Sequence, residues 1–315
     1  MRRFFLSLAM AALAGTASAQ TYPDKQITLI VPFAAGGTSD IIARIAADEM
    51  SQILGQRMVI ENIGGAGGSI ALTRAAAATP DGYTLVIGNA GTNAATYSIH
   101  KDLKFTTDSF RPIGMIAKTL PVIAVKTGFP AKDVKSFIEY AKANPGKVTL
   151  GHAGIGSSNF LICKLFVQAA KVNVELVGYR GAGPALNDAI GGHVDGVCDA
   201  ATSVASSING GKINGLVMAG RKRAELLPQV PTAAEAGLPG FTNEGWNALF
   251  APAGTPDAVI AKLNETLRKA VASEKVTKRL SELASFPASG EEFDPTYVKG
   301  FVEAEVKKYR ELLTE

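Results

Sequence analysis

A short apolar run, a glycine-bearing turn and a helix-forming segment alternate along most of this 315-residue chain. The run ITLIVPF leads into AAGGTSD and then into a segment whose apolar residues recur at helical spacing to about Leu54. MVIEN, TLVIGN, VTLGH and VELVG begin further units of the same kind. Such alternation predicts parallel sheets flanked by helices, so the expected fold class is α/β.

Two apolar segments break the alternation because neither contains a tight turn. PIGMIAKTLPVIAVKTG and the late GWNALFAPAGTP both suit strands that cross between two lobes. The segment from DAVIAKLNETLRKAVAS to VKKYRELLTE has the pattern of amphipathic helices and is expected to pack on the first lobe. We therefore predict two lobes, each with a central, mostly parallel sheet flanked by helices, and a ligand cleft between them. Residues 20–120 and 247–315 form the expected lobe 1, and residues 121–246 form lobe 2.

The first nineteen residues, MRRFFLSLAMAALAGTASA, combine a basic start, a short apolar run and a small-residue end. This pattern indicates a secretory signal peptide, residues 1–19, that is cleaved before Gln20. The alternative is an N-terminal membrane anchor, which needs about 20 apolar residues and is disfavoured because this run is shorter. The mature protein is therefore expected to be exported and soluble.

The charge pattern argues against a nucleic-acid partner. Removing Arg2 and Arg3 with the signal peptide lowers the formal charge from +4 to +2. The triplet Arg221-Lys222-Arg223 has no aromatic residues beside it that could stack on bases, so we interpret it as a solvated loop.

The few cysteines and histidines do not indicate a metal centre or a catalytic site. The three histidines and two cysteines lack metal-ligand spacing. The chain contains no P-loop lysine and no G-x-S-x-G elbow, so we expect neither catalysis nor a cofactor. Cys163 and Cys198 either pair in an oxidising compartment or remain two buried free thiols, and the sequence leaves both alternatives open.

Two matching turns, VPFAAGGTSD and LGHAGIGSSN, each stand between an expected strand and an expected helix. Ligands of parallel sheets bind beyond the carboxyl ends of the strands, and helix N-termini suit anions because their N–H groups lack partners. We expect the two turns to hold one carboxylate between the lobes. For each hydroxyl the alternative is a helix cap, worth about 1 kcal/mol. The candidate residues are Phe33, Ala35, Gly36, Gly37, Thr38, Ser39, Ala153, Gly156, Ser157, Ser158 and Asn159.

A third turn, GYRGAGPALNDAI, adds Tyr179, Arg180 and Gly181 to the candidate site. Arg180 either reaches an anion or forms a surface or interlobe salt bridge. Asp199 ends another apolar run, and it either accepts hydrogen bonds from loop amides or caps the segment after it. The strand TLVIGN ends in Asn89, and Thr92 and Asn93 follow it. We expect specificity to reside in these three residues together with Asn159 and Arg180.

The order of these motifs resembles the Bug family, the substrate-binding proteins of tripartite tricarboxylate transporters. The resemblance rests on YPDKQITLIVPFAAGGTSDIIAR, ENIGGAGGSIA, TPDGYTLVIG, GIGSS, YRGAGPALNDAIGGHVDG and GWNALFAPAGTP. It implies a periplasmic, type II binding protein that closes on its ligand, with residues 33–39 and 154–158 holding a carboxylate, partly through water. Many members of the family resemble this chain but have histidines at the positions of Asn93 and Asn159. This difference implies that the distal group of the ligand is less anionic here, or that hydrogen bonds rather than charge recognise it.

We therefore predict a monomeric solute-binding protein for a small carboxylate, either a di- or tricarboxylate or an aromatic acid. Phe33 and Tyr179 are the side chains that would flank an aromatic ring. The expected partners are the permease subunits of a tripartite tricarboxylate transporter. One alternative is an exported sensory protein that binds a receptor kinase, and another is an exported α/β hydrolase.

Overall fold

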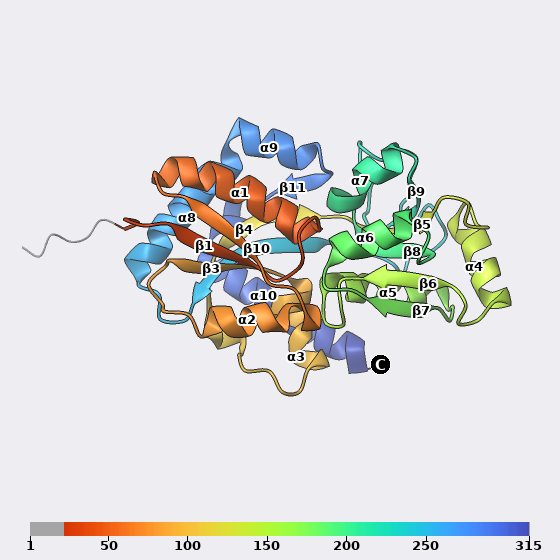
Figure 1. Ribbon diagram of the computed structural model, residues 1–315, viewed down its shortest axis with the longest axis horizontal. Coiled ribbons are helices and arrows are strands. Elements are labelled where there is room, and N and C mark those ends of the chain that lie inside the picture. The colour runs from red at the N-terminus through yellow and green to blue at the C-terminus, as the bar shows by residue number, and fades with distance from the viewer. Residues whose placement is uncertain (1–21, 315) are drawn as a thin grey trace, which may run out of the picture.

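The computed structural model describes residues 22–314, which form two lobes joined side by side (Figure 1). The predicted signal peptide, residues 1–19, lies outside the described residues. Within residues 22–314, no helix is both long and apolar enough to cross a bilayer.

Lobe 1 contains a six-stranded sheet with the strand order β11-β4-β10-β3-β1-β2. Its strands are β1 (Ile27–Val31), β2 (Met58–Asn62), β3 (Thr84–Asn89), β4 (Phe110–Thr119), β10 (Gly245–Pro252) and β11 (Ser285–Pro287). Its helices are α1 (Thr38–Leu54), α2 (Ser69–Ala76), α3 (Thr96–Ile99), α8 (Asp257–Ala272), α9 (Glu274–Ser281) and α10 (Pro295–Thr314). The C-terminal helices α8 and α10 contact β4, as the amphipathic pattern predicts.

Lobe 2 contains a five-stranded sheet with the order β7-β6-β8-β5-β9. Its strands are β5 (Pro121–Lys126), β6 (Thr149–His152), β7 (Glu175–Gly178), β8 (Gly196–Ala200) and β9 (Ile213–Met218). Its helices are α4 (Val134–Ala143), α5 (Ser158–Ala170), α6 (Ala182–Ile190) and α7 (Ala201–Asn209). Alternate residues of β5 face opposite ways, so that Ile123 packs in a core with α4 and α5 while Val122 packs in a core with α6 and α7.

The α/β class and the two sheet-and-helix lobes are confirmed, but both sheets are mixed. β1 pairs in parallel with β2 and β3, and β6 with β7 and β8. β10 and β5 pair antiparallel with both of their neighbours. These two strands are the ones by which the chain enters a sheet from the other lobe, and each runs against the strands beside it.

The chain crosses between the lobes twice, and the first crossing falls within the segment PIGMIAKTLPVIAVKTG. β4 belongs to the first sheet and β5 to the second, and only Leu120 separates them. The return passes from β9 through residues 219–244 to β10. The exact lobe boundaries stay a prediction, since β10 already begins at Gly245.

The two cysteines form a disulfide inside lobe 2. Cys163 on α5 and Cys198 on β8 are fully buried, with their Cα atoms 5.4 Å apart. The bond ties α5 to the central strand beside Phe137 and Phe166, in the core between α4, α5 and the sheet. Of the two alternatives open from the sequence, the structure shows the pairing.

Candidate functional site

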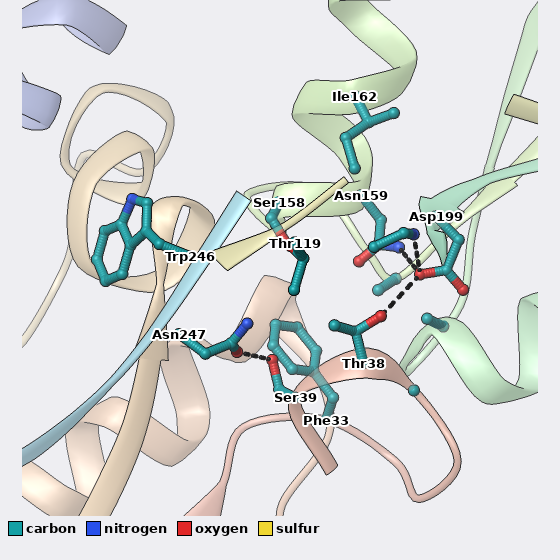
Figure 2. Close-up of a pocket in the computed structure, with 14 residues that line it drawn as sticks. Phe33, Thr38, Ser39, Thr119, Ser158, Asn159, Ile162, Asp199, Trp246 and Asn247 are labelled. Carbon is teal, nitrogen blue, oxygen red and sulfur yellow. Dashed lines mark hydrogen bonds between the residues drawn. The ribbon is translucent and has the colours of Figure 1, made fainter. Parts of the chain in front are cut away.

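A small cavity lies between the lobes, and residues of both lobes line it (Figure 2). Its volume is about 30 Å³, which is room for roughly two or three water molecules. The cavity as it stands is therefore too small for a ligand of several carbon atoms. The lining residues are Phe33, Gly37, Thr38, Ser39, Thr119, Ala153, Ser158, Asn159, Ile162, Ala182, Asp199, Ala200, Trp246 and Asn247.

The starts of four helices meet at this cavity. α1 contributes Thr38 and Ser39, α5 contributes Ser158 and Asn159, α6 contributes Ala182, and α7 follows directly after the lining residue Ala200. The residues that precede α1, α6 and α7 make no side-chain cap. The first N–H groups of a helix carry partial positive charge and need acceptors, so the four starts favour an anion placed between them.

α5 differs because its own serine caps it. The Ser157 hydroxyl accepts a hydrogen bond from the Phe160 N–H at 3.1 Å and donates one to the Gly154 carbonyl at 2.6 Å. Ser157 is fully buried and does not line the cavity, whereas Ser158 does. The capping alternative therefore describes Ser157.

On the lobe 1 side, a chain of hydrogen bonds orients Asn247. The Asn89 side-chain amide donates to the Ser39 hydroxyl at 3.2 Å, and Ser39 donates to Asn247 Oδ1 at 2.8 Å. Figure 2 shows the amide nitrogen of Asn247 turned toward Thr119, on the cavity side of β10. This arrangement leaves an amide donor facing the space between the lobes.

Asp199 is a carboxyl at a site that otherwise presents donors. Its Oδ1 accepts hydrogen bonds from Ala200 N at 2.8 Å, Asn159 Nδ2 at 2.9 Å and, across the cleft, the Thr38 hydroxyl at 3.4 Å. Its Oδ2 is buried and has no hydrogen-bond partner among the described residues. Burial raises the pKa of Asp199 because a low-dielectric site disfavours the charged form, although hydrogen bonds from Ser203 and these donors oppose the rise. The sequence left open whether Asp199 accepts hydrogen bonds from loop amides or caps the helix after it. The geometry favours the first, because Asp199 accepts a hydrogen bond from the Ala200 N–H and α7 has no side-chain cap.

Phe33 belongs to the cavity wall and to the core at once. The ring is only 5% exposed. It packs against Ala153 and Ala182, which come from lobe 2. Phe33 thus joins the two lobes, and its contact with a ligand stays a prediction.

Other predicted residues lie away from the cavity lining. Asn89 Oδ1 accepts from the N–H groups of Gly91 and Thr92, and the Thr92 hydroxyl donates to Asn93 Oδ1 at 2.8 Å. These asparagines and Thr92 form a buried network behind the site, which supports it only through Ser39.

The third predicted turn contributes its backbone rather than its large side chains. The Tyr179 hydroxyl donates to Asp188 at 2.7 Å, and burial together with this carboxylate raises the pKa of Tyr179 to about 12. The exposed Arg180 accepts a hydrogen bond at its carbonyl oxygen from Ala34 N, at 3.1 Å. Neither side chain lines the cavity. Ala35, Gly36, Gly156 and Gly181 likewise lie in the turns around it rather than in its wall.

Sequence reasoning missed six lining residues: Thr119, Ile162, Ala182, Ala200, Trp246 and Asn247. Thr119 and Asn247 lie on the crossing segments, which were interpreted only as connections. The available signal was an asparagine inside the apolar run GWNALFAP, because a buried polar residue in a strand needs partners.

The chain matches known proteins over nearly its whole length. The model of a family described as the tripartite tricarboxylate transporter family receptor matches residues 42–315. The protein BugT of Bordetella pertussis is 30% identical, over 98% of this chain and 94% of its own.

Two solved structures share the fold closely. MatC from Rhodopseudomonas palustris, solved with bound malate, is 36% identical, with a TM-score of 0.89 over 92% of this chain and 99% of its own. Another R. palustris protein, solved with adipate, is 32% identical, with a TM-score of 0.88 over 93% of this chain and 97% of its own.

Proposed function

The chain belongs to the tripartite tricarboxylate transporter receptor family, which includes Bug proteins, and from this premise we propose that it captures a small dicarboxylate between its lobes. The family and the fold are those of periplasmic binding proteins, not of enzymes. The captured ligand is handed to the permease of a tripartite tricarboxylate-type transporter, and the protein acts in the periplasm as a monomer after cleavage before Gln20.

The observation that carries the proposal is the meeting of four helix starts at one enclosed cavity. Within residues 22–314, no lysine or arginine lines that cavity. A carboxylate is therefore held by backbone N–H groups, by the Asn247 amide and by hydroxyls, each a donor of the kind that binds anions at helix N-termini. Because donors come from both lobes, the anion stabilises the closed arrangement more than the open one.

The bound acids of the two solved neighbours favour dicarboxylates. Malate and adipate differ in length, yet each carries a carboxylate at both ends. We propose that one carboxylate lies at the helix starts and the other toward β10.

A ligand screen tests this proposal. The mature chain is unfolded and refolded to remove any bound ligand, then tested by thermal shift with mono-, di- and tricarboxylates and aromatic acids, including malate and adipate. A ligand at a hundred times its dissociation constant adds about 2.7 kcal/mol to the free energy of unfolding. We expect a dicarboxylate to give this shift. A shift from none of the acids, or hydrolysis of model esters that a single serine substitution abolishes, overturns the proposal.

A further inference from the structure

The two lobes touch backbone to backbone on both sides of the cavity, at glycines. At Gly91, which follows β3, an added Cβ would lie 2.2 Å from the backbone nitrogen of Ser158 at the start of α5. At Gly183, in the first turn of α6, it would lie 2.3 Å from the carbonyl oxygen of Ala35. Neither glycine has a positive φ. The opposite lobe, rather than the local backbone conformation, requires glycine at these two positions.

Three more glycines extend these contacts. A Cβ added at Gly67 would lie 2.0 Å from the Ile155 carbonyl oxygen, and one added at Gly64 would lie 2.5 Å from the Arg180 carbonyl oxygen. A Cβ added at Gly181 would lie 2.8 Å from the Ala34 nitrogen. We call the five residues Gly64, Gly67, Gly91, Gly181 and Gly183 the glycine seam. None of them lines the cavity.

Hydrogen bonds cross between the lobes next to the seam. Ala34 N donates to the Arg180 carbonyl at 3.1 Å. On the other side, His100 Nε2 lies 3.3 Å from the Ile155 carbonyl oxygen. The backbones of Ala34 and Arg180 reach their distance of 3.1 Å only because no side chain stands between them, which the glycines of the seam allow.

The hinge lies at a separate place. The chain crosses between the lobes at Leu120 and again before β10. The hydroxyls of Thr202 on α7 and Ser285 on β11 share a buried hydrogen bond of 2.7 Å there. Separation of the seam therefore leaves this connection in place, as a hinge motion requires.

We propose that the glycine seam is the device that lets the lobes close, so that ligand affinity depends on residues outside the cavity lining. A Cβ at Gly91 needs ordinary contact at 3.4 Å instead of 2.2 Å, which holds the lobes apart locally by more than 1 Å. A protein that closes only part of the time binds with an apparent Kd raised by the inverse of the closed fraction. The inference rests on the proposed function in one respect, namely that the ligand is held in the closed state.

The test compares Gly91→Ala and Gly183→Ala with Gly300→Ala. Gly300 lies in α10, where an added Cβ meets nothing within 4 Å, so it reports the general effect of alanine in a helix. Spin labels at the exposed Lys104 and Lys164, introduced as Lys104→Cys and Lys164→Cys, report the distance between the lobes. Calorimetry with malate and adipate reports Kd.

We expect each seam variant to lose the short-distance population and to weaken Kd tenfold or more, with an unchanged melting temperature in the absence of ligand. Gly300→Ala keeps the wild-type distances and Kd. If neither acid binds the wild type, malate and adipate are excluded as ligands of the proposed function, and the label distances without ligand still decide on the seam. Seam variants that keep the short distance, or a wild type that never shows it, overturn the inference. The two variants lie in different lobes, so misfolding of one leaves the other as the test.

Discussion

Replacing Asp199 with asparagine tests whether a buried carboxyl holds a proton in the closed protein. Asp199 is fully buried, Oδ1 accepts the hydrogen bonds, and Oδ2 has no partner among the described residues. The residues packed against the carboxyl are Thr38 of α1, Asn159 of α5 and Ser203 of α7, none of them charged. These neutral donors offset only part of the loss of water around an ionised Asp199.

The direction of the effect follows from linkage. Burial raises the pKa of Asp199 above its ordinary value of 3.8, which the residue approaches when unfolding or opening exposes it to water. The folded, closed state therefore binds more protons than the exposed state between those two pKa values. The stability that the protonated carboxyl contributes is fully present below pH 3.8 and is lost as the pH rises through the raised value. Within this window each pH unit changes the equilibrium up to tenfold, which is about 1.4 kcal/mol.

Thermal unfolding of the wild type and of Asp199→Asn between about pH 4 and pH 8 measures this contribution. We expect the wild type to lose stability relative to the variant as the pH rises. Asp195→Asn is a control of opposite sign, since hydrogen bonds from Lys126 and Thr149 outweigh burial and lower the pKa of Asp195. Its contribution is present above pH 3.8 and is lost as the pH falls. Parallel curves for wild type and Asp199→Asn would refute the reasoning.

Three further outcomes follow from the contacts. The disulfide spans 35 residues, and its reduction should lower the free energy of unfolding by about 4 kcal/mol by the chain-entropy estimate. Denaturant titration with and without reductant measures this loss. A Cys163→Ala/Cys198→Ala variant should not respond to reductant. Ser157→Ala should cost about 1 kcal/mol of stability as a lost helix cap, and a large loss of affinity at unchanged stability would show a ligand contact instead. Asn247→Ala should weaken dicarboxylate binding by about 1.5 to 3 kcal/mol in calorimetry if its amide bonds the anion, and an unchanged Kd would remove it from the site.

Local patterns were enough for the elements and for the loops of the site. The helix from Thr38 to Leu54 and the strand Met58–Asn62 appear where apolar spacing places them, because that spacing reports which side of an element is buried. The turn VPFAAGGTSD was identified for the same reason, since a strand end, two glycines and a helix start all lie within ten residues.

The roles of individual side chains depended on partners distant in sequence. Ser157 and Ser158 are neighbours with the same chemistry, yet one caps α5 and the other faces the cavity. Asn247 enters the site through Ser39, 208 residues away. Neither assignment follows from spacing along the chain, because each depends on the direction in which a side chain leaves its own element.

The sequence by itself determined the class of fold and the position of the glycine-bearing turns between strands and helices, since both follow from periodicity and from glycine at helix starts. Only the tertiary structure decided that Cys163 meets Cys198, that Asp199 is buried among donors, and that Gly91 and Gly183 face the backbone of the other lobe. Local sequence shows a glycine as a flexible point in its own chain. The need to leave out a Cβ at Gly91 and Gly183 arises from a second backbone that folding brings to 2.2 Å and 2.3 Å from the Cβ positions.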